Sequence, residues 1–266
     1  MSNEVSVANS LLDSVLNLPG FKVNRQKFLY EILTDKNLSN SEIDKILEGK
    51  ITDVLSISEI DNLAKNRIFK HKTKVTAVSA ALGIPGGVAM IASAPADVAQ
   101  FYYYSGILSQ ELAYLYGFND LWEPQNNDLT FEGKEAMVLF IGTMLGVGAA
   151  SQVVKEITIR LAKHVPDKLM KQALTKTLIY QVTRKVLKYI GIKLTKEGFS
   201  KTIGKAIPFV GAAISGGLTY YSFGEGANRL QSKLSEAINE KDINSLDDII
   251  DIDAEWIESC QNSTPQ

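Results

Sequence analysis

The chain has 266 residues, of which 45% are apolar and 22% are charged, and this composition is that of an ordinary globular protein with a sizeable core. Its single cysteine, Cys260, excludes a framework of internal disulfides. The amino terminus lacks the features of a secretory signal peptide, so the sequence predicts a cytoplasmic protein.

The first 70 residues are predicted to form several short amphipathic helices. Apolar side chains recur at helical spacing over residues 5–17, and the LPG sequence at 18–20 ends that helix. A second helix is expected to begin within VNRQKFLYEIL, residues 23–33.

Serine caps are expected at the start of the next two helices. Ser39 or Ser41, each followed three residues later by an acidic residue, can form a capping box, and Gly49 is the expected stop. The stretch SISEIDNLAKNRIFKH, residues 56–71, repeats this pattern with either of its first two serines as the cap.

Three later runs carry no charged residue: 75–96, 136–154 and 206–224. Each has about the 20 residues that a membrane-spanning helix needs. However, the runs are rich in small residues, which let helices approach closely in lipid or in a dry protein core alike. Buried core helices, reversible membrane insertion and constitutive spanning therefore all stay open, and core helices are favoured.

Two segments that overlap the first and third runs share a pattern of turn-forming residues, and this pattern predicts helical hairpins. The two segments begin with Ile-Pro at residues 84 and 207, continue through a Gly/Ala-rich stretch and reach a Tyr-Tyr pair. The residues expected to shape the hairpins are Pro85, Gly86, Gly87, Pro95, Pro208, Gly211, Gly216 and Gly217.

The net charge of −2 conceals a strong segregation along the chain. Residues 155–205 hold 13 Lys/Arg against 3 Asp/Glu, whereas residues 206–266 hold 3 against 10. The basic block can face anionic lipid, nucleic acid or the chain's own acidic tail, and nucleic acid is the least favoured of these partners.

Within the basic block, residues 167–194 are predicted to form an amphipathic helix with an apolar stripe. Such a helix can lie on a bilayer, or it can pack into the bundle and show its cations to water. The cations expected to contact a membrane or anionic lipid are Lys171, Lys176, Arg184, Lys185 and Lys188.

Asp97 is the most unusual carboxylate, because it follows Pro95 in an apolar stretch. Its position suits the first turn of a helix, where a carboxylate meets unpaired backbone amides, and it is also the candidate functional carboxylate for a cation, a proton or a partner. Glu111 should lie on the same helix but roughly 21 Å away, so the two carboxylates cannot act together as an acid and a base.

No recognisable motif for catalysis, metal or cofactor binding is present. His71 and His164 are the only histidines, and neither has a second ligand at a metal-binding spacing. The sequence contains no GxSxG and no phosphate-binding GxxxxGK[ST] loop. The sequence therefore predicts no metal, no cofactor and no catalytic residue.

Three segments together resemble the EcsC family of bacterial proteins: LPGFKVNR at 18–25, GIPGGVAMIASAPADVAQFYYYSGILSQELAYLYG at 83–117, and GKAIPFVGAAISGGLTYYSFGEGANRL at 204–230. The resemblance covers roughly residues 15–235 and leaves the acidic tail outside. It implies an all-helical protein with no established catalytic activity, encoded in some relatives beside an ABC transporter.

These observations predict an all-α fold, a multi-helix bundle with glycine-rich central helical hairpins. Its regions would be amino-terminal short helices (1–70), an EcsC-like helical core (71–235) and an acidic tail (236–266). The leading function is a non-enzymatic protein, peripheral at the cytoplasmic leaflet, that acts as a membrane-perturbing effector or in stress response. A soluble interaction module that regulates a transporter or another protein is the alternative, and an unrecognised hydrolase is third; self-association stays open.

Overall fold

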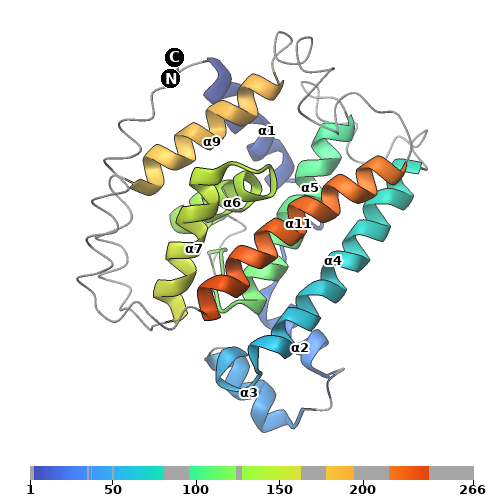
Figure 1. The fold of residues 1–266 in the computed structure, drawn as a ribbon, viewed down its shortest axis with the longest axis vertical. Helices are drawn as coiled ribbons and strands as arrows, with labels where there is room; N and C mark the ends of the chain where they lie inside the picture. Colours follow the sequence, from blue (N-terminus) through green and yellow to red (C-terminus); the bar gives the residue numbers. More distant parts are fainter. Residues whose placement is uncertain are drawn as a thin grey trace.

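The computed structural model describes residues 3–34, 36, 38–49, 51–80, 96–123, 128–162, 178–194 and 216–239. These residues form a multi-helix bundle (Figure 1), which confirms the all-α fold class predicted from the sequence. Within them, the one β-type pairing is an isolated antiparallel bridge between Trp122 and Leu129.

Residues 3–53 form short helices, as predicted: α1 (Asn3–Leu16), α2 (Arg25–Thr34), α3 (Asn40–Glu48) and the 3₁₀ turn η1 (Ile51–Asp53). The next helix, expected over residues 56–71 as another short one, is 24 residues long and ends at Ala80. Gly20 has a φ of 77°, in the left-handed region that glycine adopts without strain, and this lets the chain turn between α1 and α2.

Capping boxes start α3 and α4 (Ile57–Ala80). The backbone amide of Glu42 donates to the Ser39 hydroxyl at 3.3 Å, and the amide of Ser39 donates to the Glu42 carboxylate at 2.9 Å. Ser56 and Glu59 repeat this reciprocal pair at 3.4 and 2.9 Å. The capping prediction is confirmed, and Ser39 and Ser56 are the caps among the serines considered.

Three long helices form the centre of the bundle: α4, α5 (Ala96–Leu115) and α11 (Gly216–Asn239). Helix α4 packs against both α5 and α11, which are seen beside it in Figure 1. Residues late in α4 meet the start of α11, where the Lys72 ammonium lies 3.9 Å from the Tyr220 ring centroid. Residues early in α4 meet its end, because Ser235 donates a hydrogen bond to Asp61 at 3.0 Å. Helices α4 and α11 are therefore antiparallel.

A buried polar cluster ties these three helices together. Asp61 of α4 accepts a hydrogen bond from the Tyr116 hydroxyl at 2.6 Å, just beyond the end of α5, and another from Gln231 of α11 at 3.1 Å. Gln231 also donates to the Tyr116 hydroxyl at 2.8 Å. Burial, followed by the hydrogen bond to Asp61, raises the pKa of Tyr116, so its hydroxyl remains a donor.

The uncharged run 136–154 lies in a helical hairpin inside the bundle. It occupies most of α6 (Phe131–Met144) and the first half of α7 (Gly148–Ala162), and the chain turns between them at Gly146, whose φ is 82°. The apolar side chains of α6 from Ala136 to Met144 are buried. For this run, the interpretation as core helices is confirmed.

Helix α9 (Leu178–Leu194) packs against α1 and α6. Gly191 lies so close to α1 that a Cβ atom at this position would collide with the backbone of Glu4. Likewise, a Cβ on Gly142 of α6 would lie 2.8 Å from the Val186 side chain. Gly142 and Gly191 therefore allow α9 to approach α6 and α1 closely, as expected for small residues at a helix contact.

Most of the residues expected to shape the other two hairpins lie outside the described residues. These are Pro85, Gly86, Gly87, Pro95, Pro208 and Gly211. Gly216 and Gly217 form the start of α11.

Candidate functional site

The first candidate site is the outer face of α9, defined by Tyr180, Arg184, Lys185, Lys188 and Ile192, which are all exposed. They follow one another at nearly helical spacing on the side that faces away from the bundle. The sequence of α9 contains no aspartate or glutamate.

The apolar stripe of α9 faces the opposite way. Ile179, Val182, Val186 and Ile190 are buried in the hydrophobic core. Of the two roles that the sequence leaves open for this helix, the structure shows packing in the bundle. A helix whose apolar stripe is used in this way can contact a bilayer only with its outer face.

Two large apolar side chains flank the cations. Tyr180 is 50% exposed and Ile192 is 43% exposed, although most apolar side chains of α9 are buried. The Arg184 guanidinium lies 5.6 Å from the Tyr180 ring centroid, and one of its nitrogens is 3.5 Å from the Tyr180 hydroxyl. The outer face thus combines positive charge with one exposed aromatic and one exposed aliphatic side chain.

The other predicted site residues are placed as follows. Lys171 and Lys176 lie outside the described residues. Asp97 is the second residue of α5, so its backbone is in a first helical turn as expected, but its side chain is outside what the structure describes. Glu111 lies on the same helix, as predicted.

The second candidate site is centred on Glu111, whose side chain is only 6% exposed. Arg67 donates to both of its oxygens, from Nε at 2.8 Å and from Nη2 at 2.5 Å. The Nε2 atom of His71 lies 2.9 Å from the same carboxylate. Both partners come from α4, where they are four residues apart and therefore share a helix face.

These contacts determine the charge state of Glu111. Burial favours the neutral acid and would raise the pKa, but hydrogen bonds from His71 and Arg67, with the charge of Arg67, outweigh burial. The pKa of Glu111 therefore lies below its ordinary value, and the carboxylate is ionised at neutral pH. Sequence analysis missed Arg67 and His71, although their spacing of four residues was a usable signal.

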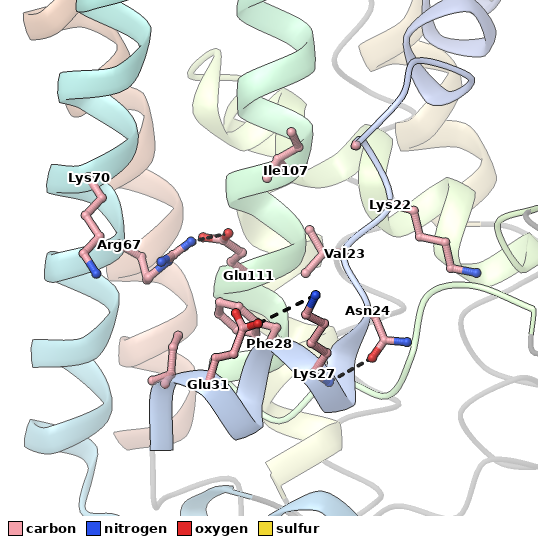
Figure 2. Close-up of a pocket in the computed structure, with 12 residues that line it drawn as sticks. Lys22, Val23, Asn24, Lys27, Phe28, Glu31, Arg67, Lys70, Ile107 and Glu111 are labelled. Atoms are coloured by element: carbon pink, nitrogen blue, oxygen red, sulfur yellow. Dashed lines mark hydrogen bonds and ion pairs between the residues drawn. The ribbon is translucent and has the colours of Figure 1, made fainter. Parts of the chain in front are cut away.

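A cavity of about 370 Å³ opens over the Arg67–Glu111 pair. Figure 2 shows that its charged side chains come from α2, α4, α5 and the segment before α2. Six of them line it, four cationic and two acidic: Lys22, Lys27, Arg67, Lys70, Glu31 and Glu111. The cations exceed the carboxylates, so the cavity is suited to an anion rather than to a metal ion.

The wall of the cavity before α2 is fixed by Gln110 of α5. Its amide group donates to the Phe21 carbonyl at 2.9 Å and accepts from the Val23 amide at 3.0 Å. Trp122 donates its indole N–H to the same Gln110 oxygen at 2.7 Å. Residues 18–25 and residues 110–117 thus meet in the fold, through the bonds of Gln110 to Phe21 and Val23, and contribute to one side of this cavity.

Arg25 anchors the start of α2 beside this wall. The side chain is buried and donates to the carbonyls of Phe118 and Leu47, both at 3.1 Å, and of Gly49 at 3.3 Å. Burial lowers the pKa of Arg25. Because three carbonyls hold its guanidinium, Arg25 fixes the position of the first residue of α2.

Two further properties concern the described part of the chain as a whole. No helix there combines the length and the apolar composition that crossing a bilayer requires. Among the same residues, no cluster of histidine, cysteine, aspartate and glutamate is arranged to hold a metal ion.

Comparison of this chain with family models, with curated proteins and with solved structures finds no match.

Proposed function

We propose that this protein is a non-enzymatic helical protein, similar to the EcsC family, that docks reversibly on the anionic cytoplasmic surface of a membrane. The observation that carries the proposal is the outer face of α9, where three exposed cations are flanked by exposed Tyr180 and Ile192. Because α9 packs tightly on α1 and α6, this face is presented by a rigid element. Such docking would suit an effector or stress-response protein that acts at the membrane.

The charge on this face supports reversible binding. A lysine or arginine near an anionic leaflet contributes about 1 kcal/mol, so Arg184, Lys185 and Lys188 together contribute about 3 kcal/mol. Partial burial of the Tyr180 and Ile192 side chains adds on the order of 1 kcal/mol for each. A total binding free energy of this size is enough to hold a peripheral protein reversibly on a membrane, and no helix has to insert.

The sequence on either side of α9 strengthens the same surface charge. Residues 163–177 contain four lysines and one acidic residue, and residues 195–205 contain three lysines and one acidic residue. Both segments lie outside the described residues, so they support the proposal through their composition alone.

Flotation of the purified full chain with vesicles tests the proposal. We expect the protein to float with vesicles that contain phosphatidylserine, to remain at the bottom with purely zwitterionic vesicles, and to lose binding as salt rises. Changing Arg184, Lys185 and Lys188 to Glu should abolish flotation. A matched control changes the exposed Lys36, Lys45 and Lys65 to Glu, which alters the net charge equally but leaves α9 intact.

Two results would overturn the proposal. The first is wild-type protein that stays at the bottom with anionic vesicles at low salt, in which case the soluble interaction module becomes the better hypothesis. The second is equal loss of flotation in the α9 variant and in the control, which would assign binding to net charge instead of to this face. Circular dichroism melting of both variants confirms that they are folded.

A further inference from the structure

The outer face of α9 belongs to a strongly basic region of the chain. Residues 163–205 hold 11 Lys/Arg against 2 Asp/Glu, and within them the structure shows Arg184, Lys185 and Lys188 exposed on α9. All other residues up to Asn239 hold 16 Lys/Arg against 20 Asp/Glu. The excess positive charge of this protein is therefore concentrated in the region that contains α9.

The opposite charge is concentrated in the part of the acidic tail that follows α11. This acidic segment, residues 240–266, holds 8 Asp/Glu against 1 Lys and lies outside the described residues. In the sequence its carboxylates alternate with large apolar side chains, among them Leu246, Ile249, Ile250, Trp256 and Ile257. In composition the acidic segment complements the outer face of α9, where Tyr180 and Ile192 are exposed beside the cations.

The acidic segment is long enough to reach this face. It follows Asn239 at the end of α11, and α7 lies between that end and α9 (Figure 1), in contact with both helices. Two helix contacts separate the axes of α11 and α9 by about 20 Å, and the 24 residues of α11 are about 36 Å long. An extended chain of 27 residues spans up to about 90 Å, which exceeds both distances combined.

Attachment to the same chain makes a weak contact sufficient. A tethered segment meets its site at an effective concentration on the order of 1 mM. A contact with an intrinsic Kd of about 0.1–1 mM would then cover the outer face of α9 for between about half and about nine-tenths of the time. Such coverage lowers the apparent affinity of this face for any other ligand by about two- to tenfold.

We propose that the acidic segment docks on the outer face of α9 and competes there with the anionic membrane surface. The same cations and the same two apolar side chains serve both ligands, so this face binds either the segment or the membrane. The docking itself does not depend on a membrane, whereas the competition rests on the proposed function. Because a surface rich in anionic lipid displaces the segment most readily, the competition would confine the protein to strongly anionic membranes.

Zero-length cross-linking of the full chain with a carbodiimide tests the docking without a membrane. The reagent joins a carboxylate to a lysine amine only where the two groups are in contact. We expect amide bonds from the acidic segment to Lys185 or Lys188 of the same chain, located by mass spectrometry. The exposed Lys45 and Lys65, on α3 and α4, are the matched controls and should form far fewer of these bonds.

Two cross-linking results would overturn the docking. One is a segment that forms no bond to Lys185 or Lys188, or forms bonds to the control lysines as often. The other is bonding between two chains instead of within one, which a mixture of isotopically labelled and unlabelled protein reveals.

Flotation with phosphatidylserine vesicles tests the competition. The tail variant converts half of the carboxylates of the acidic segment to amides, by changing to Asn the residues Asp247, Asp248, Asp251 and Asp253. It should bind the vesicles about two- to tenfold more tightly than the wild type. The matched control makes the same change of net charge at four exposed positions elsewhere, by converting to their amides Asp44, Glu48, Glu123 and Glu225. The control should gain less affinity than the tail variant, and an equal gain in both would overturn the competition.

The two proposals fail in distinguishable ways. If neither the wild type nor the tail variant floats at low salt, the competition fails together with membrane docking, and the cross-links alone decide whether the segment lies on α9. If the wild type floats, but the cross-links are absent and the tail variant gains no affinity, membrane docking stands and the role of the acidic segment is wrong.

Discussion

Arg67 of α4 binds both carboxylate oxygens of Glu111 of α5, with N–O distances of 2.8 and 2.5 Å. The two residues are 44 positions apart in the chain, and the pair fixes how α4 and α5 pack. Glu111 is almost completely buried. Removing one partner of such a pair is destabilising, because the other charge is left buried without a counter-ion.

Replacing Glu111 with Gln should destabilise the fold by about 3 kcal/mol, because the change leaves the Arg67 cation without its buried counter-ion. Urea denaturation at neutral pH measures this loss. The matched control is Glu225→Gln, which breaks the exposed Glu225–Arg229 pair of α11 and should cost no more than about 0.5 kcal/mol. Equal costs in the two variants would show that the buried pair contributes no more than a surface pair.

The same carboxylate should make stability depend on pH. The pKa of Glu111 is lowered in the folded protein from an ordinary value of 4.5, so the folded state holds its proton less tightly than the unfolded state does. The stabilisation is therefore complete above the unfolded pKa and is lost as the pH falls below about 4.5 and through the folded pKa.

Denaturation curves of the wild type and Glu111→Gln, recorded from about pH 6 to about pH 3, measure this contribution. The difference in unfolding free energy between them should shrink as the solution becomes more acidic. A difference that stays constant over this range would contradict the assignment of the ionised state to Glu111.

Sequence patterns predicted the features that depend on neighbouring residues. The Ser39 cap is an example, because a hydroxyl and a carboxylate three residues apart meet within a single helical turn. The two faces of α9 are another, since helical spacing alone separates Val186 from Lys188.

The Glu111 site could not be predicted in this way. Sequence reasoning compared Glu111 with Asp97 on its own helix, whereas its partners Arg67 and His71 come from α4. Their contact depends on the register in which α4 and α5 pack, and no short-range pattern specifies that register. The cavity over the pair was missed for the same reason.

Gly191 should be one of the positions most sensitive to a small substitution. A Cβ atom there would collide with the backbone of Glu4, so Gly191→Ala must move α9 away from α1 and should destabilise the protein by about 1–3 kcal/mol. Gly148, the first residue of α7, is the matched control, because a Cβ there would meet no atom within 4 Å. Gly148→Ala should be neutral or slightly stabilising in the same thermal melts, and a Gly191→Ala protein as stable as the control would show that α9 is not closely packed on α1.

The last prediction separates the apolar and the cationic parts of the α9 outer face. Changing Tyr180 and Ile192 to Ser removes side chains that are 50% and 43% exposed, so it should affect membrane binding more than folding. With about 1 kcal/mol lost for each, the partition coefficient on phosphatidylserine vesicles should fall by roughly ten- to thirtyfold.

The salt dependence of binding should be unchanged in this variant, because all three cations remain, whereas loss of Arg184 or Lys188 should reduce both the affinity and its salt dependence. The matched control is Tyr30→Ser with Phe69→Ser, since these side chains are 53% and 61% exposed on α2 and α4. If the control weakens binding as much as the α9 variant does, the membrane-contacting surface is not the outer face of α9. If neither variant weakens binding, the contact is purely electrostatic, and Tyr180 and Ile192 do not reach the bilayer.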